Sequence, residues 1–207
     1  DWVDRNDNDQ TAYHLHNWSQ ILSPAIFPAL ESVASRLVVT CHDFFNICPN
    51  GGFTDFRRSR PCELKPLSLR CLANPCDRRS NLHKYWRVAR QVHLNRLAAV
   101  VRSRATFTFL HDRMRTKFTD TGFSARQMET IPNPVEPWSR TRILAEQNRE
   151  FLFVGRLGTD KGADLAVEAC ARADVPLTMI GSGELEHQLR QAGGGDVRFA
   201  GWCSRTE

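Results

Sequence analysis

The sequence predicts a mixed α/β protein, and three observations lead to that class. Short apolar runs alternate with segments of helical periodicity over most of the 207 residues. Glycine-rich turns follow two of the apolar runs, at 155–162 and 181–183. The third observation is a regular order of strand, helix, strand, helix, strand, which is typical of parallel strands joined by crossovers. Its segments are 151–155, 162–173, 177–180, 184–192 and 197–200.

The length and composition of the chain limit its possible domain organisation and class of function. A chain of 207 residues can form one large domain or two small ones. Its net charge of +5 is compatible with anionic substrates, a membrane surface or nucleic acid, and does not choose among them. No apolar run is long enough to span a bilayer, and no secretory segment opens the chain. Seven cysteines exclude a fully paired disulfide framework within one chain, so we expect a cytoplasmic protein.

The first strand and helix are expected before residue 42. Residues 11–16 alternate as a strand does, and His14 and His16 share one of its faces, where simple packing is one account of them. Ser23-Pro24 is typical of a helix start, and an apolar stripe then predicts a helix over 26–34.

A second strand is expected over 37–41. It places His42 and Asp43 just past its carboxyl end, where α/β proteins bind ligands. His42 is therefore a candidate to hydrogen-bond a sugar hydroxyl or act near a reacting centre, against the alternative of a structural histidine.

Residues 44–79 form a long segment with little periodicity, which is usually functional or partly disordered. Zinc knuckles favour cysteine pairs two to four residues apart, and only Cys71 and Cys76 come close to that. A structural metal and buried free thiols both stay open. The arginines of 57–104 lack a nucleic-acid recognition motif, so a solvated or membrane-facing surface is the more economical account. The four cysteines of the segment are Cys48, Cys62, Cys71 and Cys76.

A long helix is expected next, starting after Ser80 and ending near residue 101. Its predicted buried face carries Leu82, Trp86, Ala89 and His93. The elements that follow are a strand at 106–110, a helix at 111–121, a strand at 128–131 and a proline-rich linker at 135–150.

The turn at 155–162 is the strongest candidate for a ligand site. A buried strand leads into it, a helix leaves it, and it carries Arg156 and Lys161. Turn amides, a helix N-terminus and two cations suit a diphosphate held without a metal. The alternative is an ordinary loop with two solvated cations. The turn at 181–183 repeats the pattern one βα unit later, although Gly-Ser-Gly is also a common connector. Neither turn has Walker or dinucleotide-fingerprint spacing.

Four motifs, in this order along the chain, resemble those of the retaining nucleotide-sugar glycosyltransferases of family 4. These are the group 1 enzymes, which have the GT-B fold of two Rossmann-like domains. The insert with Cys62, Cys71 and Cys76 is similar to that of the bacterial polysaccharide-assembly members. The motifs are Thr40-Cys41-His42-Asp43 with Cys48-Pro49, Ile131-Pro132-Asn133-Pro134-Val135, Phe153-Val154-Gly155-Arg156-Leu157 with Lys161-Gly162, and Ile180-Gly181-Ser182-Gly183.

The resemblance implies transfer of a hexose, with retention, from a nucleotide-diphosphate sugar to a saccharide or lipid-linked acceptor in cell-surface polysaccharide synthesis. It implies that His42 lies near the transferred sugar as the catalytic residue. Arg156 and Lys161 would bind the donor's diphosphate, and Gly181 and Gly183 would contact the nucleotide. Fixed cations at the departing diphosphate stabilise the transition state more than the ground state. Neither a metal nor another cofactor is expected.

The resemblance also divides the chain. It implies a partial acceptor-side domain at 1–134 with the cysteine-containing insert at 44–79, a linker at 135–150, and a partial nucleotide-sugar-binding domain at 151–207. The family's amino-terminal glycine-rich loop and its E-x7-E motif are absent, so we expect an internal piece of a longer enzyme that transfers no sugar alone. The expected partners are the donor, the acceptor and an anionic membrane surface, but not nucleic acid.

Two other classes of function remain as alternatives. A basic, non-enzymatic binding module held by a cysteine–metal loop would contain stoichiometric zinc and bind nucleic acid in a steeply salt-dependent way. A dinucleotide oxidoreductase would need the glycine fingerprint and an acidic ribose partner, and the chain lacks both.

Overall fold

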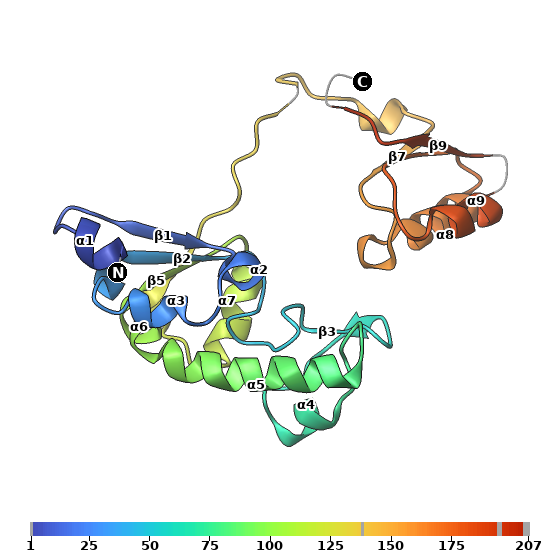
Figure 1. Ribbon diagram of the computed structural model, residues 1–207. Helices are drawn as coiled ribbons and strands as arrows, with labels where there is room; N and C mark the ends of the chain where they lie inside the picture. The colour runs from blue at the N-terminus through green and yellow to red at the C-terminus, as the bar shows by residue number, and fades with distance from the viewer. Residues whose placement is uncertain (1, 138, 194–195, 205–207) are drawn as a thin grey trace. The chain divides into compact units, whose positions relative to one another are not determined.

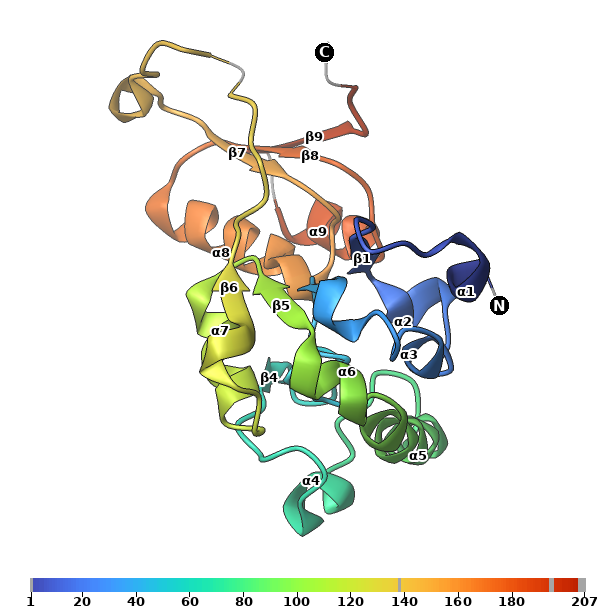
Figure 2. The ribbon, with the colours of Figure 1, turned by 90° about the vertical axis from the view of Figure 1, so that its left-hand side faces the viewer.

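The computed structural model describes residues 2–137, 139–193 and 196–204, which divide into two compact units. Unit 1 spans Asp1–Val135 and unit 2 spans Glu136–Glu207. Each unit contains a parallel sheet with helices, as Figures 1 and 2 show. The α/β class with two Rossmann-like sheets is therefore confirmed.

The main sheet of unit 1 has four parallel strands in the order β1-β2-β5-β6. Alternate side chains of these strands point into one apolar core, which includes the fully buried Phe107, Phe109 and Val39. The opposite face of β1 and β2 is polar and partly exposed. The strands are β1 (Tyr13–His16), β2 (Leu37–Cys41), β5 (Thr106–Phe109) and β6 (Met128–Thr130).

Nearly all the predicted elements of unit 1 are present, but the helix expected over 26–34 is wrong. Its apolar stripe is buried, yet only α3 (Ile26–Ala29) is helical before the short 3-10 turn η1 (Ala34–Arg36). Pro28 has no N–H to donate, and the amides after it bond three residues back, from Leu30 to Phe27 and from Glu31 to Pro28. The other short elements are α1 (Trp2–Asn6), α2 (Trp18–Ile21), α7 (Asp112–Thr119) and η2 (Ala125–Gln127).

The long helix α5 (Asn81–Leu97) begins as predicted, because Ser80 Oγ accepts a hydrogen bond from the His83 amide at 3.2 Å. It stops at Ala98, and α6 (Ala99–Arg104) follows. The predicted buried face is wrong, since Leu82 is 78% exposed. Trp86, Ala89 and His93 are exposed as well. The side chains that α5 buries are Lys84, Gln91 and Leu94, two of them polar.

The segment 44–79 is folded, with an antiparallel pair of short strands, β3 (Thr54–Asp55) and β4 (Arg60–Pro61), and one helix, α4 (Leu69–Ala73). In Figure 1 this cysteine insert lies against the amino-terminal end of α5. Three of its four cysteines are buried, so thiols and polar side chains fill much of its interior.

Unit 2 has three parallel strands in the order β7-β8-β9, and α8 and α9 lie on the same face of this sheet in both Figure 1 and Figure 2. Leu157, Val167, Leu177 and Met179 form the centre of its core. The predicted βαβαβ order is confirmed. Its elements are β7 (Phe151–Val154), η4 (Thr159–Lys161), α8 (Ala163–Ala173), β8 (Leu177–Ile180), α9 (Glu186–Ala192) and β9 (Val197–Gly201).

Two further features of unit 2 bear on its surface. Strand β7 is at the sheet edge, and its Phe151, Leu152 and Val154 side chains are all more than half exposed. The described residues between 136 and 150 form only the 3-10 turn η3 (Ala145–Gln147), and they are exposed. No helix in the described part of the chain is long and apolar enough to cross a membrane.

Candidate functional site

The first group of candidate residues lies at the carboxyl ends of β1 and β2. His16 pairs with Thr40 in the parallel register, and His42 follows β2 directly. His14 and His16 are exposed on the polar face of the sheet, where their ring centroids lie 4.0 Å apart. The structure brings both of them together with His42.

The three histidines form a continuous hydrogen-bonded chain that ends on two threonines. His42 Nε2 lies 2.9 Å from His16 Nδ1, and His16 Nε2 lies 3.3 Å from His14 Nδ1. His14 Nε2 is 2.7 Å from Thr40 Oγ1, which is 2.7 Å from Thr108 Oγ1 on β5. The histidine chain, defined as His42, His16, His14, Thr40 and Thr108, thus crosses three strands.

Proton positions in the histidine chain are coupled. A neutral imidazole carries one N–H, so every bond can run from His42 towards Thr108, or every bond can run the opposite way. In the first order the outer nitrogen of His42, Nδ1, is a free acceptor. In the second order Nδ1 carries the proton and donates. His42 Nδ1 can therefore either accept or donate a hydrogen bond without breaking any bond of the chain.

Desolvation and neighbouring charges shift the pKa values of titratable groups in this region. Partial desolvation of its ring lowers the pKa of the exposed His14, and the positive charges of His16 and His42 lower it further. Burial also raises the pKa of Asp43, although the Phe45 amide donates to Asp43 Oδ1 at 3.0 Å and favours its ionised form.

The second group of candidates lies in unit 2, at the carboxyl end of β7. Arg156 NH2 pairs with Asp160 Oδ2 at 2.5 Å, and both side chains are partly exposed. The Lys161 side chain is exposed and has no hydrogen-bond or ion-pair partner among the described residues. Gly162 then adopts φ +72° and starts α8, so the two cations lie just before a helix N-terminus.

The glycines of the second turn have a structural reason that the sequence did not reveal. A Cβ on Gly181 would strike the Gly155 carbonyl, whose carbon would be 2.9 Å away. A Cβ on Gly183 would strike the Leu157 carbonyl oxygen and lie 2.7 Å from the Leu157 nitrogen. These glycines therefore let the two turns pack backbone against backbone.

Hydrogen bonds join the same two turns. Leu157 N–H donates to Ser182 at 3.0 Å, and Leu185 N–H donates to Leu157 at 3.1 Å. The Gly181 amide, expected to meet a nucleotide, donates instead to the Gly201 carbonyl at 2.6 Å. The turns thus form one rigid surface at the carboxyl edge of the sheet, with Arg156 and Lys161 on it.

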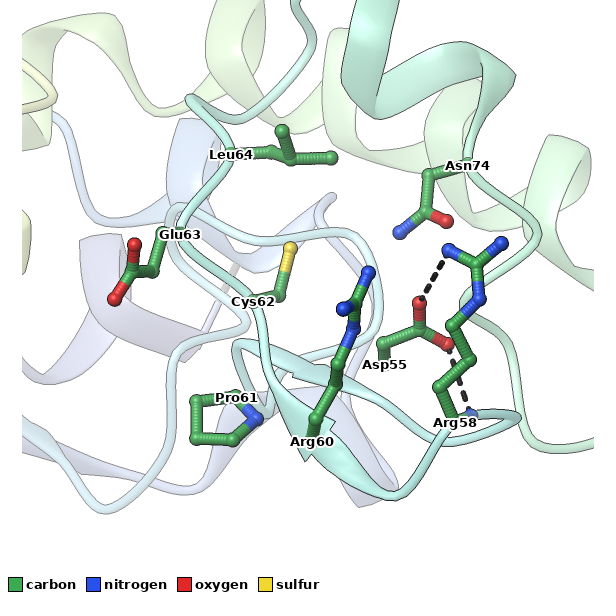
Figure 3. Close-up of a pocket in the computed structure, with 8 residues that line it drawn as sticks. All are labelled: Asp55, Arg58, Arg60, Pro61, Cys62, Glu63, Leu64 and Asn74. Carbon is green, nitrogen blue, oxygen red and sulfur yellow. Dashed lines mark hydrogen bonds and ion pairs between the residues drawn. The ribbon is translucent and has the colours of Figure 1, made fainter.

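The cysteine insert contains a pocket of about 610 Å³. Figure 3 shows the Arg58 and Arg60 guanidinium groups and the Asn74 amide near its opening, with Asp55 below them. Asp55 is buried, and its Oδ2 lies 3.6 Å from Arg58 NH1. The other residues of the pocket wall are Pro61, Cys62, Glu63 and Leu64.

All seven cysteines are free thiols. Within the described residues, no group of three or more histidine, cysteine, aspartate or glutamate side chains is arranged to hold a metal ion. Cys62 lines the pocket, whereas Cys48, Cys71 and Cys76 are buried beneath it.

The sequence reasoning missed His14, His16 and Asp160. Two histidines two residues apart on a strand were a signal for a shared face, but their contact with His42 depends on β1 lying beside β2. The spacing of Arg156 and Asp160 was readable as an ion pair four residues apart, although the pair forms in a turn.

The comparisons with known proteins found similarity to solved structures of one protein. Neither a protein-family model nor a curated protein sequence matches the chain. The chain is similar to crystal structures of Anabaena Alr3699/HepE at 14% identity. With UDP-glucose, the TM-score is 0.42 and the match covers 93% of this chain and 69% of that one. With UDP, the values are 0.45, 94% and 70%. With UDP and glucose, they are 0.40, 93% and 69%.

Proposed function

We propose that the chain is part of a retaining glycosyltransferase. It would move a hexose from a nucleotide-diphosphate sugar to a saccharide or lipid-linked acceptor, in cell-surface polysaccharide synthesis. The observation that carries the proposal is the pair Arg156 and Lys161 at the carboxyl end of β7, on a turn fixed against the Gly-Ser-Gly turn. This edge of a parallel sheet is where α/β proteins bind nucleotides.

The charge state of the turn suits a diphosphate. The bond from Arg156 to Asp160 is partly exposed, and such a pair contributes only about 0–1 kcal/mol. A diphosphate offers more negative charge and more oxygens than one carboxylate, so it can take Arg156 from Asp160. Lys161 needs no such exchange. The two cations would then stabilise the charge that grows on the leaving nucleotide diphosphate, without a metal or another cofactor.

His42 is the residue that we assign to the transferred sugar. The histidine chain lets the outer nitrogen of His42 accept or donate a hydrogen bond while every inner bond stays intact. Such a group can hold a sugar hydroxyl in either sense, and it can exchange a proton near the reacting centre.

Donor binding tests the proposal. UDP-, GDP- and ADP-glucose would be titrated into the protein and followed by calorimetry, with Arg156→Ala and Lys161→Ala as the test variants. Arg172→Ala is the matched control, because Arg172 forms an exposed ion pair with Glu168 four residues away, as Arg156 does with Asp160. We expect each test variant to weaken binding about tenfold or more and the control to leave it unchanged. Equal affinity in all four proteins would exclude the site.

For the acceptor side we propose a surface on α4 and α5 that meets an anionic membrane at the cytoplasmic face. Leu69, Leu82, Tyr85 and Trp86 are all more than half exposed there. Arg79, His83 and Arg87 line a shallow hollow with Leu82 and Trp86. Exposed apolar side chains among cations are typical of interfacial binding.

Vesicle sedimentation tests this surface. We expect the protein to pellet with vesicles that contain anionic phosphatidylglycerol, and Trp86→Ala to reduce the bound fraction. Trp202→Ala is the control, since Trp202 is 78% exposed in unit 2. If both variants bind as the parent does, α5 is not the membrane surface.

A further inference from the structure

Lys84 of α5 is buried, and the hydrogen-bond partners of its ammonium group within the described residues are sulfur atoms. Its side chain is 2% exposed, and Nζ lies 3.2 Å from Cys76 Sγ and 3.7 Å from Cys71 Sγ. Asp77, a buried acid of the same insert, pairs with Arg87 at 3.2 Å and accepts a hydrogen bond from the Arg79 amide. An ammonium group in such a place requires an anion, because an unpaired buried charge costs several kcal/mol.

Asn50 shows which thiol supplies the anion. Its amide orientation is fixed by the backbone, because Gly52 N–H donates to Asn50 Oδ1 at 3.0 Å and Nδ2 donates to the Thr54 carbonyl at 2.8 Å. Nδ2 therefore points its second hydrogen at Cys76 Sγ, 3.3 Å away. The Cys48 thiol instead donates to Asn50 Oδ1 at 3.2 Å, so Cys48 keeps its proton.

Cys76 Sγ thus receives two N–H donors, from Lys84 and Asn50, and this is the environment of a thiolate. Burial lowers the pKa of Lys84, but the hydrogen bond to Cys76 and the electrostatic effect of the surrounding cysteine sulfurs outweigh it and raise that pKa. The Cys71 sulfur also lies 3.7 Å from the same ammonium nitrogen.

We propose that Cys76 is a peroxide-sensitive modification site, activated by Lys84 and resolved by Cys71 to a disulfide. The Cys76 thiolate attacks a peroxide: an S–O bond forms and the O–O bond breaks. The departing hydroxide takes a proton from the Lys84 ammonium and leaves as water. The Cys71 sulfur then attacks Cys76, its thiol proton joins the displaced hydroxide, and a second water forms. Two thiols are oxidised and one peroxide is reduced.

Oxidation changes the packing of the insert as well as its covalent state. The disulfide removes the anion that neutralises Lys84, which leaves the amine buried against neutral sulfur. Lys84 then either stays neutral or moves to solvent, and both changes loosen the contact between α5 and the cysteine insert. Cys71 belongs to α4, a helix of five residues, so local opening of that helix admits the peroxide.

Peroxide titration of the 207-residue protein tests the proposal, with differential alkylation and mass spectrometry as the readout. We expect Cys76 and Cys71 to lose free thiol together and to appear in one disulfide-linked peptide. Cys170 is the internal control, because it is buried to a similar extent and lies in unit 2, outside the cysteine insert. Acetylation of the Lys84 amine by an acylating reagent is expected to rise after oxidation.

Two variants separate activation from resolution. Lys84→Met is expected to slow Cys76 oxidation about tenfold, while Lys65→Met, an exposed lysine of the same insert, leaves it unchanged. If Lys84→Met does not fold, Cys71→Ser keeps the Lys84–Cys76 pair, and a dimedone probe should then label a sulfenic acid at Cys76. The proposal is overturned if Cys76 reacts no faster than Cys170. It is also overturned if stoichiometric zinc or iron leaves the protein as the thiols oxidise.

Discussion

Gly183→Ala tests whether the two turns of unit 2 are fixed by each other or only by a ligand. Gly183 does not need a left-handed backbone, so alanine introduces no backbone strain there. Its new Cβ would instead meet the Leu157 backbone, with the carbon and nitrogen both at 2.7 Å. Leu157 is fully buried, so it cannot move aside freely.

The expected loss of stability in Gly183→Ala follows from the packing and the hydrogen bonds that Leu157 would lose. Overpacking a core costs about 1–3 kcal/mol, and two hydrogen bonds run through Leu157, each contributing about 1 kcal/mol. We expect Gly183→Ala to destabilise unit 2 by about 3 kcal/mol without any ligand. Gly201→Ala is the control, since Gly201 has φ +75° with open space around it, and it should cost about 1 kcal/mol of strain.

Hydrogen exchange of the amides in β8 and α8, read by mass spectrometry, reports the stability of unit 2 separately from unit 1. Protection of these segments should fall far more in Gly183→Ala than in Gly201→Ala. A loss for Gly183→Ala that is equal to or smaller than that of the control would refute the packing account. The glycine would then be required only for nucleotide approach.

Three further predictions concern titration and surface behaviour. Desolvation and the neighbouring His16 and His42 lower the pKa of His14, so the folded protein should lose stability as the pH falls below 6.5. His16→Gln should raise the pKa of His14 in an NMR titration, and it should reduce this loss of stability. The hydrogen bonds from Arg36 lower the pKa of Asp7, so Arg36→Gln should destabilise the protein near neutral pH, and the difference should vanish in acid below the usual aspartate pKa of 3.8. Burial raises the pKa of Asp43, so Asp43→Asn should stabilise the protein at neutral pH more than at pH 3, in thermal melts.

Each of these three predictions has an outcome that would contradict it. An unchanged His14 titration in His16→Gln would mean that the rings do not interact in solution. A stability difference for Arg36→Gln that persists in strong acid would show that Arg36 acts through packing and its carbonyl contacts rather than through the Asp7 charge. A pH-independent effect of Asp43→Asn would point to lost hydrogen bonds instead of relieved desolvation.

The sheets could be predicted because their signal is local. Strands β2 and β7 are short apolar runs, β1 and β5 alternate polar with apolar residues, and each helix of unit 2 carries a stripe that faces one core. The helix over 26–34 failed for a local reason too, because Pro28 interrupts its hydrogen bonds while leaving the apolar stripe buried.

The buried face of α5 failed for a different reason. Hydropathy expects leucine and tryptophan inside, but α5 buries Lys84 against thiols, and Gln91 Nε2 donates to the Asn46 carbonyl at 3.1 Å. These partners come from an insert without periodicity, so no window of sequence around α5 contains the information. A polar side chain can be buried where it has hydrogen-bond partners, and a single sequence does not show which residues those partners are.

The candidate sites divide in the same way. The place of His42, Arg156 and Lys161 at the ends of strands could be read directly from the order of elements. The histidine chain could not, because it depends on the register between β1 and β2. The reason for Gly181 and Gly183 was also hidden, since it lies in a second turn that packs against the first.

The position of strand β7 at the edge of its sheet has a practical consequence for work with this protein. Its outer backbone groups and its Phe151, Leu152 and Val154 side chains offer a ready template for another extended segment. Concentrated samples should therefore self-associate by strand addition. Leu152→Lys should shift the sedimentation profile back towards that of the monomer.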